Sequence, residues 1–404
     1  MSKAHLCDGG LDLAVSIWAK SLFALAALAA FFQGHAIYYL LYALAGAYLA
    51  HRIAVVRALK RLSIARSQPK LRLFPGERMR VELTVKNQSR APLPWVRLTD
   101  RVEQGLAPVT ERSFGFALPP GGEARLAYEV EATKRGRSHL GPVAIQTGDP
   151  LGIERFDAAG TERAEVIVYP RIHPVERLGI PAKMHVGSFR AAERHLFDPS
   201  RVIGVRGYME GDSLRHVHWR ATAHTGEFMV KKFEPAGAFD LAVVLDLAAD
   251  HYASWNAGRM SELAVETAAS LLAAAAARRQ AFALYAHCAH EAAGRETPFL
   301  FSGHSKGEGH LEACLEALAL ARLTERPFDV ENLVIHAATT LRRETSLAWV
   351  APRIDAATAE GLARLHRAGF RVLVVHVSSE GSDLPIPPGV GYARVSYGAD
   401  IASL

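Results

Sequence analysis

Apolar residues are concentrated in two long runs within the first 56 positions of the chain. The first run covers Leu11–Phe32, is nearly all apolar and is interrupted by Lys20, and the second begins at Ala36 and extends to Ala50 before continuing as far as position 56. A helix needs about 20 residues to cross the hydrocarbon core of a bilayer. A tight polar turn separates the two runs, so the pattern predicts a transmembrane helical hairpin within residues 1–57.

Basic residues follow the second run closely, whereas the turn between the runs carries no charge. The cations are Arg52, Arg57, Lys60, Arg61, Arg66, Lys70 and Arg72. Cationic flanks stay on the cytoplasmic side of a membrane, and they also favour anionic lipid. The sequence therefore predicts a multi-pass protein of the cell (inner or plasma) membrane, with both termini and all soluble domains in the cytoplasm.

Two other interpretations of the apolar segment remain. Residues 1–32 could form a signal peptide, although a second apolar run and basic residues follow at once. Alternatively, one long helix could extend from Leu22 to Ala50. That version moves the N-terminus to the other side of the membrane but leaves the soluble part where it is.

From Leu71 to Pro170 the apolar positions recur with a period of two. Val81–Val85 and Leu126–Val130 alternate cleanly, and Gly- or Pro-containing turns such as Pro119–Gly122 separate the runs. Short, half-buried strands at regular spacing are typical of an antiparallel sandwich. We expect a β-sandwich-like domain over residues 65–170 that serves as a spacer or adaptor.

The period changes in the last third of the chain. Residues 171–200 are irregular and indicate a linker, after which Leu241–Leu245 forms a continuous apolar run that ends at Asp246. Further helices and strands then alternate: helices at Met260–Arg279, Glu308–Arg322 and Asp329–Arg343, and strands at Ala281–Ala286, Leu347–Val350 and Val372–Val377. Alternating β and α elements predict a parallel sheet with helices on both faces over residues 237–404.

Composition excludes some classes of function. The 47 Lys and Arg against 41 Asp and Glu give a net charge of +6, and basic residues do not interleave with aromatic ones, so nucleic-acid binding is not expected. The three cysteines, Cys7, Cys288 and Cys314, have no paired spacing. They predict neither a disulfide framework nor a zinc knuckle and fit a reducing compartment.

A signature segment lies between the linker and the sheet, over residues 201–236. Its residues of interest are Arg206, Tyr208, Gly211, Asp212, Arg215, Trp219 and Ala223. Gly211-Asp212 is a tight-turn pair, and Arg215 lies near enough to pair with Asp212 or Glu210. If the following residues form a strand, Val217 and Trp219 share one of its faces.

The signature resembles that of domain-of-unknown-function family 58 (DUF58). The resemblance extends to an N-terminal hydrophobic hairpin, a β-rich region and a later α/β domain. Gly207, Val217 and His224 depart from the family pattern, and His224 stands where a guanidinium is usual. The resemblance leaves two roles open for the signature: a salt bridge with an aromatic anchor that fixes a hairpin to the sheet, or a surface that binds a partner directly.

The resemblance also implies a domain similar to von Willebrand factor type A, and association with a MoxR-type AAA+ ATPase. Such domains bind a divalent cation through an Asp-x-Ser-x-Ser loop after the first strand. The loop here, Asp246 to Asp250, lacks both serines. A metal is therefore not expected, and no other cofactor is indicated.

One enzyme motif competes with this interpretation. Gly303–Gly307 fits the G-x-S-x-G pattern, which makes Ser305 the candidate nucleophile of a serine hydrolase with Asp355 and His376 as partners. The segment before it contains Pro298, however, and His376 falls inside an apolar run. We therefore expect a flexible loop there, and a non-enzymatic membrane-anchored interaction protein as the function, with the hydrolase as the alternative.

Overall fold

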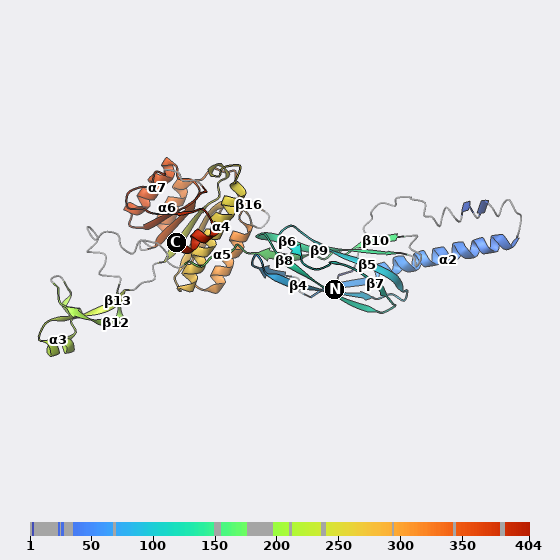
Figure 1. Ribbon diagram of the computed structural model, residues 1–404, viewed down its shortest axis with the longest axis horizontal. Coiled ribbons are helices and arrows are strands. Elements are labelled where there is room, and N and C mark those ends of the chain that lie inside the picture. Colours follow the sequence, from blue (N-terminus) through green and yellow to red (C-terminus); the bar gives the residue numbers. More distant parts are fainter. Residues whose placement is uncertain are drawn as a thin grey trace. The chain divides into compact units, whose positions relative to one another are not determined.

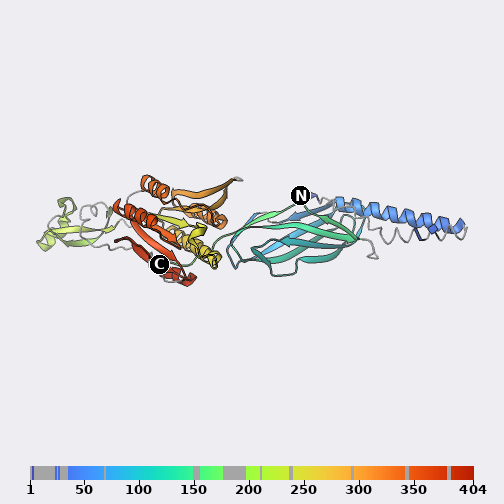
Figure 2. The same ribbon diagram turned by 90° about the horizontal axis from the view of Figure 1, so that it is seen from above.

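The computed structural model describes residues 2–3, 23–24, 26–27, 35–67, 70–148, 155–175, 197–209, 212–235, 240–292, 295–341, 345–379 and 384–404. The chain divides into two compact units, Met1–Pro170 and Arg171–Leu404. Each unit has its own sheets and core (Figures 1 and 2). The protein is therefore multi-domain, with a β-rich N-terminal unit and a C-terminal unit built on a mixed sheet.

The second apolar run of the sequence forms helix α2, His35–Lys60. Two helices of the described residues are long and apolar enough to cross a membrane, α2 and the later helix α4, by length and composition alone. Most of α4 is buried inside the C-terminal unit, whereas α2 exposes large apolar side chains such as Tyr39 and Leu49. The first run, Leu11–Phe32 with Lys20, lies outside the described residues apart from short helical pieces at 23–24 and 26–27.

Two sheets build the N-terminal unit. The first has the order β1 (Ser2–Lys3), β2 (Leu62–Arg66), β4 (Arg78–Asn87), β8 (Glu123–Ala132) and β6 (Leu106–Pro108). The second has the order β3 (Lys70–Leu73), β11 (Ala164–Val168), β9 (Gly136–Gly148), β5 (Leu93–Val102) and β7 (Ser113–Leu118), and β10 (Arg155–Ala159) also pairs with β9. All pairings are antiparallel except that of β3 with β11.

Alternation along the strands explains why the two sheets share one core. In β4 the residues Val81, Leu83 and Val85 are buried and their neighbours face outward, as the period-two pattern predicts. They belong to the same apolar cluster as Leu98 and Ile145 of the other sheet. The last turns of α2 join this cluster as well, so the helix and the sandwich form one body.

A buried ion pair crosses the sandwich core. The guanidinium of Arg66 donates to both carboxylate oxygens of Asp100, at 2.9 and 2.7 Å, and also to the carbonyl of Leu140. The hydroxyl of Tyr128 donates to Asp100 at 2.6 Å. Both charged side chains are almost fully buried. Arg66 is therefore a core residue, although its place in the sequence suggested a cation at the membrane surface.

The C-terminal unit is built on a six-stranded sheet of order β16 (Arg295–Ser305), β15 (Phe282–Ala292), β14 (Leu241–Asp246), β17 (Ser346–Ala351), β18 (Arg371–Val377) and β19 (Gly391–Val395). The run that ends at Asp246 is strand β14, as predicted. All pairs are parallel except β15 with β16, so the expectation of a wholly parallel sheet is wrong. The missed strand, β16, is an edge strand, where Pro298 costs no central ladder hydrogen bond.

Helices cover both faces of this sheet (Figures 1 and 2). They are α4 (Ala257–Ala277), α5 (Glu308–Leu320), α6 (Val330–Thr340) and α7 (Ala356–Arg367), with short 3-10 turns η3 (Ala249–His251) and η4 (Gly398–Ser403). Ala242 and Val244 of β14 share a cluster with α6 and α7, so the alternate residue Val243 faces α4. Both faces of the central strands are therefore buried, which explains their unbroken apolar runs.

The segment predicted as a linker, 171–200, is divided by the structure. Its first residues run against α4, where His173 contacts the carboxylate of Glu266 at 3.0 Å. Residues 176–196 lie outside the described part of the chain, and residues 197–200 already belong to a strand, β12.

Candidate functional site

The signature segment forms a two-stranded ribbon. Strand β12 (Phe197–Gly207) pairs antiparallel with β13 (Met229–Pro235), and the chain between them carries the 3-10 turn η2 (Leu214–His216) and the helix α3 (Trp219–Thr225). We call residues 197–235 the ribbon. Gly211, one of the signature residues, lies outside the described residues.

The expectation of a strand through Val217 and Trp219 is wrong. The ring of His218 accepts a hydrogen bond from the amide of Ala221 at 3.0 Å, which caps α3 and starts the helix at Trp219. Gly226, with φ of 77°, ends it in the left-handed region. Val217 forms only an isolated bridge with Val230.

Asp212 closes the loop after β12. Its carboxylate accepts two hydrogen bonds of 2.7 Å from Arg206 and one of 2.8 Å from the amide of Met209. The hydrogen bond from Arg206 is the main reason that the pKa of Asp212 lies below its usual value. The partner of Asp212 is therefore Arg206, whereas the sequence had suggested Arg215, which is exposed in η2.

Large apolar side chains gather on the outside of the ribbon. Trp219 is 66% exposed, Phe228 54% and Met209 67%. The rings of Trp219 and Phe228 lie 6.4 Å apart, and those of Tyr208 and Phe228 lie 6.2 Å apart, which joins them into one cluster. Leu214 is exposed as well. We call Tyr208, Met209, Leu214, Trp219 and Phe228 the ribbon cluster; of these, Trp219 and Tyr208 stood out in the sequence, while the others join them only through the fold.

Few of the ribbon's described side chains, a set that excludes those of residues 197–203 and 232–235, are buried. Among its described side chains, Val217 and Val230 are the buried apolar ones, and neither η2 nor α3 contains a buried residue. An isolated two-stranded hairpin is marginally stable in water. The aromatic residue of the signature therefore does not act as a buried anchor in this arrangement.

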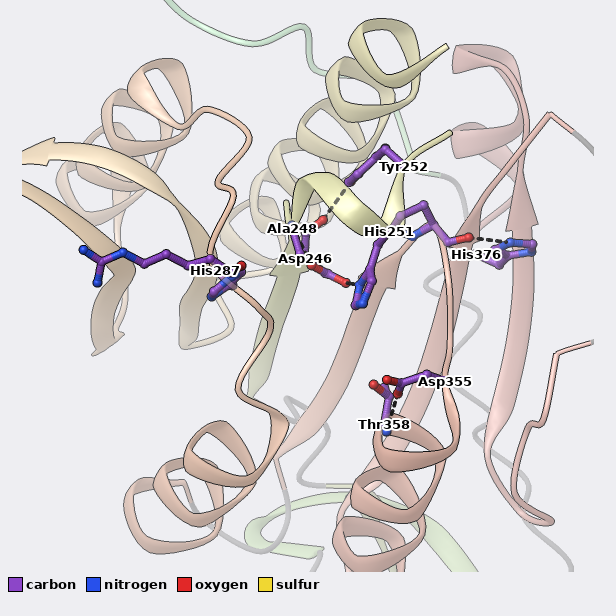
Figure 3. Close-up of polar contacts among 10 residues, drawn as sticks. Asp246, Ala248, His251, Tyr252, His287, Asp355, Thr358 and His376 are labelled. Atoms are coloured by element: carbon purple, nitrogen blue, oxygen red, sulfur yellow. Dashed lines mark hydrogen bonds and ion pairs between the residues drawn. The ribbon is translucent and has the colours of Figure 1, made fainter. Parts of the chain in front are cut away.

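A second group of polar residues lies at the carboxyl end of the sheet in the C-terminal unit (Figure 3). Asp246 ends β14 and is buried, and its carboxylate accepts hydrogen bonds from the amide of Ala248 at 2.9 Å and from the ring of His251 at 2.5 Å. Tyr252 donates its hydroxyl to the main-chain oxygen of Asp246 at 2.7 Å. The loop through Asp250 is thus folded back onto its own first residue.

The pairing with Asp246 changes the protonation of His251. The hydrogen bond to that carboxylate is the largest cause that raises the pKa of His251 above 6.5, while burial acts in the opposite direction. The negative charges of Asp250 and Asp355 raise it further. When protonated, His251 places a positive charge beside the carboxylate of Asp246, a contact that the sequence did not reveal because it forms only through the turn η3.

Candidate metal ligands do not assemble in the described part of the chain. No three His, Cys, Asp or Glu side chains there lie close enough together to hold a metal ion. His287 is buried in β15 and contacts the carbonyl of Arg326 at 3.0 Å. Asp355 caps α7 by accepting from the amide of Thr358 at 2.7 Å.

The residues of the hydrolase alternative are far apart. Ser305 ends the edge strand β16 and pairs with Phe282 at the amino end of β15, so the predicted flexible loop is in fact a strand end. His376 lies in β18, at the carboxyl end of the sheet. β18 is four positions from β16 in the strand order, which corresponds to roughly 19 Å across the sheet. Ser305 and His376 therefore cannot form a catalytic pair in this fold.

A polar cluster near this motif was not foreseen. The hydroxyl of Ser302 lies 3.2 Å from the thiol of Cys314 and 3.4 Å from the ring of His310, which also contacts the carbonyl of Phe282. Burial raises the pKa of Cys314, so it stays a neutral thiol. The cluster joins α5 to β16 and offers no activated nucleophile.

Sequence comparisons relate the signature and the mixed sheet to known proteins. Residues 204–396 match the family described as "Protein of unknown function DUF58". The chain is also 24% identical, over 222 residues, to the "Uncharacterized protein YeaD" of Bacillus subtilis (strain 168). That match covers 54% of this chain and 56% of the relative, so it spans about half of the relative's length. Both findings support the DUF58 assignment, and neither points to a catalytic family.

Two solved structures match short parts of the chain. Salmonella alpha-2-macroglobulin reacted with methylamine is 19% identical, with a TM-score of 0.23, over 28% of this chain and 7% of that protein. The CARDB domain of a Pyrococcus furiosus protein, solved with two metal ions, is 14% identical, with a TM-score of 0.20, over 26% of this chain and 86% of the domain.

Proposed function

We propose that this DUF58-like chain is a membrane-anchored, non-enzymatic interaction protein whose ribbon binds a partner protein. The main support for this proposal is the ribbon cluster, five large apolar side chains exposed on residues 197–235. The rings of Tyr208, Phe228 and Trp219 neighbour one another, and soluble proteins rarely expose such contiguous apolar groups unless they bind something there.

The chemistry of the ribbon fits a protein partner. Trp, Tyr and Arg dominate the residues that carry binding energy at protein interfaces, and Met and Phe are enriched there too. Arg215 and Arg220 are exposed beside the aromatic side chains of the ribbon. A partner that covers the cluster would also supply the apolar contacts that a two-stranded hairpin lacks. Binding and ordering of the ribbon would then be coupled.

The resemblance to DUF58 suggests which partner this is. We propose a MoxR-type AAA+ ATPase, since members of the family are commonly linked with such ATPases. We also propose that the C-terminal unit is von Willebrand factor type A-like, which its parallel strands β15, β14, β17 and β18 with helices on both faces support. In this interpretation His251 stands where such a domain would hold a cation.

The proposed anchor is α2, preceded by a first span. The pairing of β1 with β2 supports a hairpin, because Ser2 lies opposite Ile64, just past the end of α2. With residues 2–3 paired beside the end of α2, the segment between them and α2 would cross the bilayer once more in this proposal. The basic residues after the helix favour a cytoplasmic body. Protease added to intact spheroplasts should then leave the soluble units uncut, and digestion would contradict this orientation.

A quantitative pull-down from gently solubilised membranes tests the binding role. The double variant Trp219→Ala, Phe228→Ala should lose most of the partner protein that copurifies with the unaltered chain, because it removes the two rings at the centre of the cluster. Trp255→Ala is the matched control, since Trp255 is equally exposed at 72% but lies outside the ribbon. Full retention by the double variant, with the chain still folded by circular dichroism, would exclude the ribbon as the binding surface.

A further inference from the structure

The end of the sandwich where α2 enters has a fixed orientation relative to that helix. Val55, Ala58 and Leu59, in the last turns of α2, are buried in the sandwich core. The chain then passes into β2 through a single turn at Arg61. Because no flexible linker intervenes, any surface that surrounds α2 also meets this end of the sandwich.

Cations from separate parts of the sequence gather at this end. We call residues 57–63, 86–92 and 119–125 the helix end. Lys86 of β4 lies opposite Ser63 of β2. The amide of Gln88 donates to the carbonyl of Arg61 at 3.1 Å, and the amide of Asn87 donates to the carbonyl of Gly122 at 2.9 Å. Its exposed cations that form no ion pair with a described residue are Arg57, Lys60, Arg61, Lys86 and Arg90.

The helix end carries little negative charge to offset these cations. Glu123 is its acidic residue, and the carboxylate of Glu123 pairs with Arg125 at 3.1 Å. The five unpaired cations therefore leave the helix end strongly positive.

The fold also removes cations that the sequence had placed at the membrane surface. Arg66 forms a buried ion pair with Asp100 in the core and is therefore not available at the surface. Lys70 and Arg72 lie in β3, which pairs with β11. The partner of Lys70 in β11, Glu165, lies opposite His139, near the end of β9 that is away from the helix end. The basic surface thus keeps Arg57, Lys60 and Arg61 of the cations that follow the apolar run, and the fold adds Lys86 and Arg90 to them.

We propose that the helix end of the sandwich binds anionic phospholipid headgroups, with Lys86 and Arg90 as contacts that join the cations of α2. This inference rests on the proposed membrane anchor, because α2 brings the helix end to the headgroup layer. Phosphate groups of the lipid complement the exposed ammonium and guanidinium groups, whose attraction acts within a Debye length of the surface. The contact would hold the sandwich against the bilayer.

The test uses the full chain reconstituted in vesicles of phosphatidylcholine with a minor fraction of phosphatidylglycerol. Spin-labelled lipids report, by electron paramagnetic resonance, how strongly each lipid associates with the protein. The unaltered chain should prefer phosphatidylglycerol by about threefold. Lys86→Glu, Arg90→Glu should bring that preference close to one, and 1 M salt should do the same to the unaltered chain.

A charge-matched control lies at the opposite end of the sandwich. Arg101, near the carboxyl end of β5, and Lys134, just after β8, are exposed at this opposite end and do not belong to the helix end. Arg101→Glu, Lys134→Glu should leave the lipid preference unchanged. Equal loss in both double variants, or no preference in the unaltered chain, would overturn the proposal. Failure of the membrane anchor gives a different result. If alkaline carbonate releases the chain from vesicles of pure phosphatidylcholine, the anchor is wrong, whereas a chain that stays bound without a lipid preference contradicts headgroup binding alone.

Discussion

The ring nitrogen Nδ1 of His251 lies 2.5 Å from the carboxylate of Asp246, at the carboxyl end of the central strand β14. Asp246 is buried, and an unpaired carboxylate there would be costly. The ring of His251 and the amide of Ala248 donate to this carboxylate from within the same loop (Figure 3). Both oxygens of Asp246 therefore have hydrogen-bond donors inside the fold.

The stability of the C-terminal unit should depend on pH through His251. Its pKa is raised in the folded state, mainly by the hydrogen bond to Asp246. The stabilisation is then fully present below the unfolded pKa of about 6.5 and is lost as the pH rises through the folded pKa. The difference in free energy of unfolding between the unaltered chain and His251→Gln should be larger at pH 5.5 than at pH 9, as measured by urea denaturation.

A second buried histidine, His376, also makes the stability of this unit depend on pH. Burial lowers its pKa in the folded state, so its contribution has the opposite sign and destabilises the fold as the pH falls. The difference between the unaltered chain and His251→Gln cancels this effect, because both contain His376. Two parallel curves of stability against pH would contradict the assigned role of His251.

Magnesium should not bind at this end of the sheet. Both carboxylate oxygens of Asp246 already accept hydrogen bonds, from the amide of Ala248 and from His251. Calorimetric titration of the chain with Mg²⁺ should give no binding heat, and EDTA should leave the melting temperature unchanged. A saturable heat that Asp246→Asn abolishes would show that a cation displaces His251.

The ion pair of Arg66 and Asp100 should be a major determinant of sandwich stability. Asp100→Ala leaves the guanidinium of Arg66 buried without its partner, which should cost about 3–5 kcal/mol of unfolding free energy. Arg78→Ala is the control, because the Arg78–Glu131 pair is exposed and should be worth less than about 1 kcal/mol. Chemical denaturation measures both, and equal losses would argue against the buried character of the first pair.

The ribbon should open when Asp212 is replaced. Asp212→Ala removes the acceptor of the Met209 amide and both hydrogen bonds from Arg206. Exchange of the Met209 amide with deuterium should become faster, as it should in Arg206→Ala. Arg215→Ala should leave the exchange rate of the Met209 amide unchanged, since no described hydrogen bond joins Arg215 to this loop. Faster exchange in Arg215→Ala would instead support a pairing of Arg215 with Asp212.

Local patterns predicted much of the fold. Period-two alternation identified strands such as β4, and the unbroken apolar run identified β14, because burial on one or two faces leaves a direct trace in the sequence. Strand β16 was missed because Pro298 suggested a break, which an edge strand tolerates. Helix α3 was missed because its cap is His218, an uncommon residue at such a position.

The candidate site was predicted less completely, since it depends on contacts between distant residues. Asp212 and Trp219 stood out by their pattern, but the partner of Asp212 comes from β12 and the ring beside Trp219 is that of Phe228, just before β13. The burial of Arg66 likewise depends on Asp100, which lies 34 residues away. Such pairings follow from topology and leave no local trace.

Site-specific photo-crosslinking in native membranes tests the binding role of the ribbon most directly. A benzophenone amino acid replaces Leu214, an exposed member of the ribbon cluster, or Trp255, an equally exposed residue outside it. The account predicts a light-dependent adduct with another protein from position 214 and none from position 255. Absence of any adduct from position 214, or identical adducts from both positions, would contradict it.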